Sequence, residues 1–197
     1  VQTCALPISL GKVHTLDLTG YANITDVSAL RNVHTLVLNS CPSITDVSAL
    51  GQVHSLFLCC CNSITDVSAL GQVHTLYLAY CSGITDVSAL RKVHTLDLTC
   101  CHDITDVSVL GQVHTLWLCG CVNITDVSAL GQVHTLWLCD CVNITDVSAL
   151  TNYSILYWCR KITRSLNCLQ HFAGRFVHWI SLASTYGNVS KYENQFM

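Results

Sequence analysis

Three side-chain types that bind metals or exchange protons recur in this chain at a constant spacing of 20 residues. Imidazole and thiolate groups are ligands of zinc, carboxylates bind calcium, and imidazole changes its charge near neutral pH. The three series are His14, His34, His54, His74, His94, His114 and His134; Asp26, Asp46, Asp66, Asp86, Asp106, Asp126 and Asp146; and Cys41, Cys61, Cys81, Cys101, Cys121 and Cys141. Their chemistry depends on how closely the repeated units bring them together.

The histidine series has two chemical interpretations and one structural interpretation. If successive units lie about one strand spacing apart, the imidazoles can bind metal or respond to pH. Every unit carries the same histidine, so copying of the unit explains the series without any ligand. We therefore expect no metal site. We do expect the fold to weaken in acid, because neighbouring imidazolium ions repel one another.

The aspartate series is explained by local backbone structure. Calcium needs several oxygen ligands that converge on one ion. Each of these aspartates instead follows a threonine and precedes an apolar residue, as in Thr25-Asp26-Val27. An aspartate in that place accepts hydrogen bonds from backbone N–H groups of a turn. Capping of turns is therefore the prediction.

Fourteen cysteines are many for a chain of 197 residues, but six of them occupy one fixed place in the repeated unit. We expect the series from Cys41 to Cys141 to point inward and to pack as small apolar side chains. Cys119 and Cys139 lie at a variable position and are expected to be neighbours on adjacent units. Without a second set of ligands they are weak candidates for zinc. Free thiols, and with them a cytoplasmic location, are the prediction.

Catalytic motifs do not stand out in the sequence. There is no pairing of a nucleophile with a base, no phosphate-binding loop and no zinc motif. Serine and histidine recur in every unit, whereas an active site is a unique constellation. We therefore predict that the protein is not an enzyme and that it needs no cofactor.

Seven copies of one unit, V-H-T-L-x-L-x-x-C-x-x-I-T-D-V-S-A-L-x-x, fill residues 10–150 without insertion. The Leu-x-Leu pair places two side chains on one face of a short strand, because side chains alternate along a strand. One unit cannot bury its apolar residues alone, so stacked units must share a continuous core. In the first unit these residues are Val13, Leu16, Leu18, Ile24, Val27 and Leu30. So short a coil leaves room only for a turn or one 3-10 turn over Thr25–Leu30, capped by Thr25 or Asp26.

The unit resembles the leucine-rich-repeat family, whose signature is L-x-x-L-x-L-x-x-N/C-x-L. The signature positions are Val13, Leu16, Leu18, Tyr21 and Ile24 in the first copy, with cysteine at the Tyr21 position in later copies. A cysteine followed by I-T-D is similar to the F-box type of repeat, and the short period with its D-V-S-A-L ending is similar to bacterial internalins. The resemblance implies an α/β-type, mostly β, right-handed solenoid. Its parallel sheet would be concave, with short turns or 3-10 segments on the convex side.

The two ends of the chain depart from the repeat. Residues 1–9 begin Val-Gln-Thr-Cys-Ala-Leu-Pro-Ile, which matches an in-frame translation of a common sequencing-library adapter, and we interpret them as an artefact. That interpretation predicts a longer protein. Residues 151–197 contain two weak copies of the strand segment. We interpret them as degenerate repeats or a C-terminal cap, with an out-of-frame tail as the alternative.

Charge is spread unevenly along the chain, whose formal net charge is −3. Residues 10–150 carry eleven aspartates against four lysines and arginines, a net of −7, and residues 151–197 have a net of +4. An acidic repeat region argues against nucleic acid as a partner. No apolar run is long enough to span a membrane. We expect neither a nucleic-acid partner nor a membrane span.

Variable positions within the repeat predict where a ligand binds. The framework barely changes between units, whereas the outward strand position changes most, and in this family that position lines the concave, ligand-binding face. Aromatic residues there are of the type enriched at binding hot spots. Exposed tryptophans on neighbouring coils are also unusual without a partner. The predicted ligand-binding residues are Asp17, Val37, Phe57, Tyr77, Asp97, Trp117, Trp137, Asn39, Tyr80 and Asp140.

The leading hypothesis is a non-enzymatic scaffold that binds a protein partner, for example as the substrate-recognition part of an F-box-like adaptor. A secreted or surface adhesin of internalin type is the first alternative. The cysteines argue against it, and the glycosylation triplets at Asn23, Asn123 and Asn143 allow it. A structural or ice-binding solenoid with regular threonine columns is the second alternative. The aromatic residues beside one of those columns argue against it.

Overall fold

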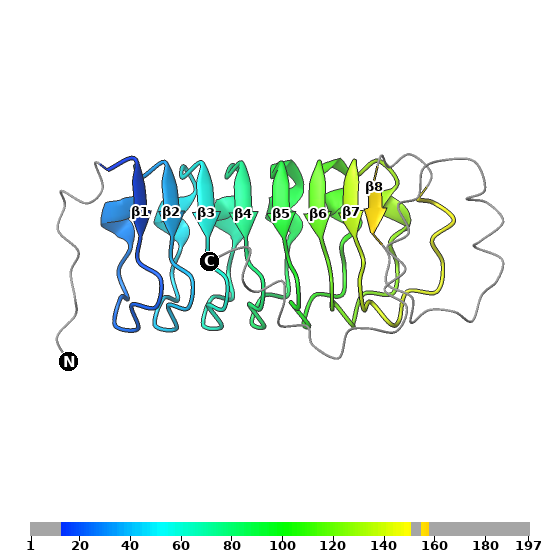
Figure 1. Cartoon of the computed structure of the whole chain (residues 1–197), viewed down its shortest axis with the longest axis horizontal. Helices are drawn as coiled ribbons and strands as arrows, with labels where there is room; N and C mark the ends of the chain where they lie inside the picture. The colour runs from blue at the N-terminus through cyan, green and yellow to red at the C-terminus, as the bar shows by residue number, and fades with distance from the viewer. Residues whose placement is uncertain (1–12, 151–154, 158–197) are drawn as a thin grey trace, which may run out of the picture.

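The computed structural model describes residues 13–150 and the backbone of 155–157. Seven coils lie side by side along a straight row, and each contributes one short strand to a single sheet (Figure 1). The sheet has eight parallel strands in chain order. They are β1 (Thr15–Asp17), β2 (Thr35–Val37), β3 (Ser55–Phe57), β4 (Thr75–Tyr77), β5 (Thr95–Asp97), β6 (Thr115–Trp117), β7 (Thr135–Trp137) and β8 (Ile155–Tyr157).

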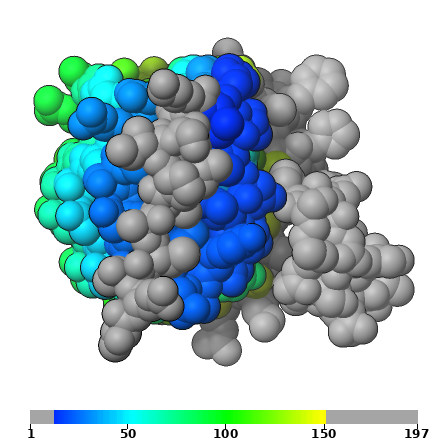
Figure 2. Space-filling view, turned by 90° about the vertical axis from the view of Figure 1, so that its left-hand side faces the viewer, coloured from blue at the N-terminus to red at the C-terminus, as the bar shows by residue number. Residues whose placement is uncertain are grey.

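The register of the sheet follows the repeat without a slip. Thr15 pairs with Thr35 and Leu16 with Leu36, and the same offset holds up to the pairing of Trp137 with Tyr157. Viewed from its first described coil, the solenoid shows atoms of the later coils beyond the edge of the first, at the left of the view (Figure 2). Each column of the repeat therefore becomes a column in space. The interpretation of residues 1–9 lies outside the described residues, as does that of 151–197 apart from the backbone of β8.

Short 3-10 helices lie on the side of the coils opposite the viewer of Figure 1, behind the strands. The described residues contain no α-helix, which confirms the prediction of a mostly β solenoid with 3-10 turns. The helices are shorter than the expected Thr25–Leu30 span. They are η2 (Ser28–Leu30), η3 (Ser48–Leu50), η4 (Ser68–Leu70), η5 (Ser88–Lys92), η6 (Ser108–Gln112) and η7 (Ser128–Leu130).

Each of these turns is capped by the aspartate of the repeat. The Ser28 N–H donates to Asp26 Oδ1 over 2.9 Å, and the Ser48 N–H donates to Asp46 Oδ1 over 2.8 Å. Accepting the hydrogen bond from Ser28 lowers the pKa of Asp26, since the bond favours the charged form. The predicted capping role of the aspartate series is thereby confirmed.

The core consists of the apolar columns of the repeat. In the second and later coils the leading valine and both strand leucines are almost fully buried; Val33 is 1% exposed. The first coil differs, because Val13 is 37% exposed and Leu16 is only partly buried. The expectation that all six apolar residues of that coil are buried is therefore wrong for these two. No described coil covers them on their outer side.

The repeated cysteines point inward, as predicted, and are fully buried from Cys41 to Cys141. Each thiol donates to a leucine carbonyl of the preceding coil, from Cys41 Sγ to Leu18 O over 3.2 Å up to Cys141 Sγ to Leu118 O over 2.9 Å. Burial raises the pKa of Cys61 to about 11 and that of Cys141 to about 12. The thiols therefore stay protonated. Tyr21, at the same position of the first coil, lies outside the core and is 61% exposed.

Candidate ligand-binding surface

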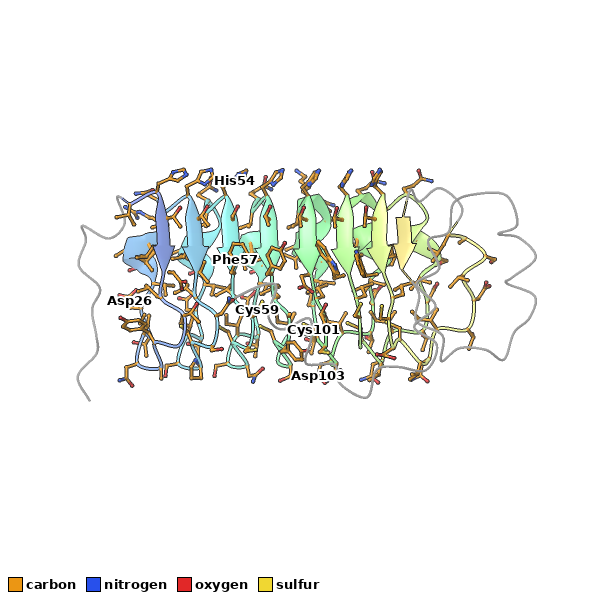
Figure 3. The ribbon with its side chains drawn as sticks, viewed as in Figure 1. Asp26, His54, Phe57, Cys59, Cys101 and Asp103 are labelled. Carbon is orange, nitrogen blue, oxygen red and sulfur yellow. The ribbon has the colours of Figure 1, made fainter. Side chains whose placement is uncertain are left out.

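The outward face of the sheet carries the predicted ligand-binding residues. In β2 to β7 the middle leucine points into the core, so the residues on either side of it point away from the core. Phe57 lies on the viewer's side of the strands in Figure 3. Phe57, Tyr77, Trp117 and Trp137 form one column on this face, which we call the aromatic row, and all four are half-buried.

The rings of the aromatic row are in contact along the sheet. Phe57 and Tyr77 stack with centroids 4.7 Å apart and planes 6° apart, and Trp117 and Trp137 stack at 6.3 Å and 22°. Tyr77 and Trp117 lie on β4 and β6, with β5 between them, yet their centroids are only 6.0 Å apart at a tilt of 32°. Strands two apart in a sheet are separated by about 9.6 Å, so these two rings lean toward each other across β5.

Asp97 occupies the position of β5 between those two rings. The register pairs it with Tyr77 on one side and with Trp117 on the other. Its Oδ1 accepts a hydrogen bond of 2.8 Å from the Thr99 N–H. Burial nevertheless raises the pKa of Asp97, although the hydrogen bonds from Thr99 act in the opposite direction. The carboxylate is thus set into the aromatic row.

The charge of this half-buried acid helps to raise the pKa of two neighbouring groups. Burial, and then the charge of Asp97, raise the pKa of Cys59 to about 12. The same two causes, in the same order, raise the pKa of Tyr77. Both groups are therefore uncharged at neutral pH. The centre of the aromatic row is an apolar environment around one carboxylate.

Asp17 sits in the same column but in a different environment. Asp17-Leu18-Thr19 repeats the local sequence of residues 97–99, and the Thr19 N–H donates to Asp17 Oδ1 over 2.9 Å. The Thr19 hydroxyl donates to the same oxygen over 2.7 Å. Asp17 is exposed and its neighbour on β2 is Val37, so the hydrogen bonds dominate and lower its pKa.

The remaining predicted residues lie at the border of this face. Val37 is half-buried on β2, and Asn39 follows that strand. Asn39 Oδ1 accepts a hydrogen bond of 2.9 Å from the Cys59 N–H, which joins two coils. Tyr80 and Asp140 are exposed and lie in the turn that follows the strand, with φ angles of 63° and 57°. The structure therefore groups the aromatic row with Asp97 and leaves these four residues around it.

Sequence reasoning missed two features of this surface. Thr99 was not singled out, although Asp followed two residues later by Thr occurs at 17–19 and 97–99 and is a known side-chain-to-backbone turn. The left-handed backbone of the turn after each strand was missed as well. The signal available for it was the glycine at two of the seven copies, Gly20 and Gly120.

The histidine series forms a ridge of stacked rings beside the strands, and His54 marks its place at the upper edge of the sheet in Figure 3. Successive centroids lie between 4.4 and 4.7 Å apart. His34 Nδ1 lies 3.3 Å from the Thr35 hydroxyl oxygen. Partial loss of hydration and the neighbouring imidazoles lower the pKa of His34. Among the described residues, no three His, Cys, Asp or Glu side chains are grouped so that they could hold a metal ion.

Cys119 and Cys139 are neighbours on adjacent coils, as predicted. A side-chain hydrogen bond with Cys139 is the main cause that raises the pKa of Cys119, and burial adds to it. The two side chains are joined by this hydrogen bond and not by a disulfide.

The chain is similar to three solved structures from Listeria monocytogenes. An internalin from Listeria monocytogenes, internalin F, matches with a TM-score of 0.60 and 25% identity over 77% of this chain and 50% of its own length. This chain is an internalin-like leucine-rich-repeat solenoid. It spans half the length of internalin F. Internalin C2 from the same species matches with a TM-score of 0.46 and 22% identity over 74% of this chain and 80% of its own length. The functional domain of InlJ, also from that species, has a TM-score of 0.29 and 20% identity over 72% and 50%.

The two other comparisons found no match for the chain. No family model matches the chain. No curated protein matches it either. The likeness to F-box repeats remains a prediction. Within the part of the chain that the structure describes, no helix has the length and apolar character needed to cross a membrane.

Proposed function

We propose that this chain is a protein-binding scaffold whose ligand surface is the outward face of the sheet, centred on the aromatic row. One observation carries the proposal. Four large aromatic side chains stand in contact on the outward face, on strands whose framework hardly varies. Half-buried aromatic residues supply large, rigid contact area, and such residues dominate binding energy at protein interfaces. The internalin-like fold supports a binding role in general.

A binding role also agrees with how the reactive residues are engaged. The aspartates of the repeat cap turns, as Asp46 does for Ser48. The cysteines of the repeat are buried and donate to carbonyl groups, as Cys81 does to Leu58. The aspartates recur seven times and the cysteines six times, so these residues serve the coil and mark no single reaction centre. We therefore infer binding rather than catalysis.

The proposal places the chain in a reducing compartment such as the cytoplasm, where an adaptor that presents other proteins would work. None of the eleven cysteines of the described residues is in a disulfide, and the six of the repeat act as hydrogen-bond donors, which requires the thiol form. A surface receptor of internalin type is the second candidate, favoured by the likeness to internalin F. The experiment that decides between them isolates the protein without reductant and alkylates its thiols after denaturation. Fully alkylated thiols support the first candidate, and paired cysteines support the second.

The test of the binding surface compares two matched variants of the whole chain. Trp117→Ala with Trp137→Ala removes half of the aromatic row, whereas Tyr21→Ala removes an exposed aromatic ring outside the row. Proteins retained from the source cells by the unaltered chain are identified, purified and titrated against all three forms. We expect the double variant to bind at least about tenfold more weakly, as for hot-spot residues, and Tyr21→Ala to bind normally. Equal affinities for all three forms would place the ligand elsewhere.

A further inference from the structure

We propose that Tyr77, Asp97 and Trp117 form a recognition site for an arginine side chain of the partner protein. The inference rests on the proposed function, because it names the chemistry by which a partner would engage the aromatic row. It depends on the register of the sheet, which sets the carboxylate of β5 between an aromatic ring of β4 and one of β6.

The two rings form the sides of the site. Their centroids are 6.0 Å apart although their strands are not neighbours, so both rings lean over the strand that carries Asp97. A planar group stacks on an aromatic ring at about 3.5–4 Å. A guanidinium group that lies against one or both rings replaces their mutual contact with a cation–π contact. This requires the rings to part by a small rotation of their side chains.

The carboxylate forms the base of the site and has acceptor capacity left. Its Oδ1 accepts the Thr99 N–H at 2.8 Å, which fixes its orientation. A carboxylate has two oxygens with about four acceptor positions, so the backbone and side-chain hydrogen bonds from Thr99 leave room for a two-pronged donor. The lysine and arginines of residues 13–150 are Arg31, Arg91 and Lys92, which lie within or directly after 3-10 helices and not on the strands. Among the residues that the structure describes, therefore, no strand carries a lysine or arginine that would complement Asp97.

Charge and shape favour arginine among the possible groups. Residues 13–150 contain eleven aspartates against those three cations, so the solenoid attracts positive side chains. Guanidinium is planar, is less strongly hydrated than ammonium, stacks on aromatic rings and bonds a carboxylate with two parallel N–H groups. The lysine ammonium is a compact and strongly hydrated charge, and it has neither the planar shape nor the two parallel N–H groups of guanidinium. A half-buried acid between two rings suits the first cation better than the second.

The chain contains its own control for this site. Asp17 has the same column position, the same Thr two residues later and the same backbone hydrogen bond, but it is exposed and is paired with Val37. If a carboxylate alone sufficed, both aspartates would bind the same probe. If the rings are required, only Asp97 would.

The experiment follows the tryptophan indole N–H signals of the ¹⁵N-labelled full chain by NMR. The probe is the peptide acetyl-Gly-Arg-Gly-amide, compared with the same peptide carrying citrulline, which is neutral and nearly isosteric, and with the lysine peptide. We expect the arginine peptide to shift the Trp117 signal in a saturable way, with a Kd of about 1–10 mM for so small a ligand. The citrulline and lysine peptides should bind at least about fivefold more weakly than the arginine peptide. Asp97→Asn should lower the affinity for the arginine peptide by a similar factor, and Asp17→Asn should leave that affinity unchanged.

Several outcomes would overturn the assignment. Equal binding of the citrulline peptide removes the charge from recognition, and equal binding of the lysine peptide removes the selectivity for arginine. Unchanged binding by Asp97→Asn, with the dispersed spectrum of a folded chain, removes the carboxylate. Trp117→Ala is a second variant, which tests whether the ring is required for binding of the arginine peptide. If Trp117→Ala does not fold, the result for Asp97→Asn alone decides the assignment. Loss of the arginine response with an intact partner titration would end this inference and keep the proposed function. A specific arginine response without any partner would do the reverse.

Discussion

Asp17 and Asp97 accept the same hydrogen bond from the backbone two residues ahead, at 2.9 and 2.8 Å, yet their pKa values are shifted in opposite directions. The local motif is identical, so the cause lies in what flanks the carboxylate across the sheet. Rings lean over Asp97 from both sides, whereas Asp17 faces solvent beside Val37. The charge state of a carboxylate on this surface therefore depends on contacts between coils and not on the local motif within one coil.

The first prediction concerns Asp97→Asn. A carboxyl whose pKa is raised in the folded state stabilises the fold most below its unfolded pKa of about 3.9, and this contribution is lost as pH rises through the folded value. Asparagine keeps an oxygen acceptor for the Thr99 N–H and removes the charge. We expect a higher melting temperature than that of the unaltered chain at pH 7 and no difference near pH 3. Thermal unfolding at both pH values measures this.

Asp17→Asn is the control for that measurement. The pKa of Asp17 is lowered, so its charged form adds stability above pH 4 that is lost as pH falls through the folded value. The substitution should therefore lower the melting temperature at pH 7. A shift in the same direction for both variants would show that the rings around Asp97 do not control its charge.

The second prediction uses two glycines with nearly the same backbone. Gly20 and Gly120 have φ angles of 76° and 73°, in the left-handed region where a Cβ atom is strained. A Cβ on Gly20 would meet nothing within 4 Å, whereas one on Gly120 would lie 2.8 Å from Cys100 Sγ. We expect Gly20→Ala to cost about 1 kcal/mol from backbone strain alone, and Gly120→Ala to cost about 1–3 kcal/mol more through overpacking.

Urea unfolding of the two alanine variants checks this difference. The further variant Gly120→Ala with Cys100→Ala removes the sulfur atom that the new Cβ would meet. Its additional cost over Cys100→Ala alone should fall back toward that of Gly20→Ala. If it does not, the space beside Cys100 is not what distinguishes the two turns.

The strength of the sequence prediction lay in features that one coil repeats. The columns of Leu18 and Cys41, the cap by Asp26 and the parallel register all follow from the unit and from the need to stack it. The outward position of the aromatic row followed from strand alternation. These relations are local or periodic, and a single sequence contains them.

Features that depend on particular neighbours were not predictable in the same way. That Tyr77 and Trp117 meet across β5 depends on ring size and side-chain rotation, which no spacing encodes. The exposure of Val13 and Tyr21 depends on what stacks against the first coil. Asn39 was predicted as a ligand contact, and the structure shows that its side-chain oxygen already accepts the Cys59 N–H. Such differences arise wherever a position is decided by the next coil rather than by its own.

The third prediction concerns the buried thiols. Cys81 is fully buried, and its Sγ donates to Leu58 O over 3.1 Å. Cys81→Ala leaves a small cavity and an unpaired acceptor site, which we expect to cost about 1–3 kcal/mol. Cys60 is exposed, so Cys60→Ala should change the free energy of unfolding by less than about 0.5 kcal/mol. Urea unfolding measures both, and similar costs would contradict the structural role of the buried column.

The fourth prediction concerns acid and the histidine ridge. His34 stacks between His14 and His54, at 4.4 and 4.6 Å, and Thr35 is its hydrogen-bonding neighbour. Because the pKa of His34 is lowered in the folded chain, the unfolded chain binds more protons as the pH falls below about 6.5. The fold should therefore lose stability as the pH falls below about 6.5, before the turn-capping aspartates, whose pKa values are lowered, begin to lose their charge.

The measurement is the urea midpoint of unfolding at half-unit steps from pH 7.5 to 3. The unaltered chain should show an early decline below pH 6.5 and a second one below pH 4. His34→Gln with His94→Gln replaces two histidines whose lowered pKa values arise in part from neighbouring imidazoles. The early decline should become smaller in this variant while the second is unchanged. A flat midpoint down to pH 4.5 would mean that the stacked rings tolerate protonation, and the acid sensitivity would then belong to the aspartates alone.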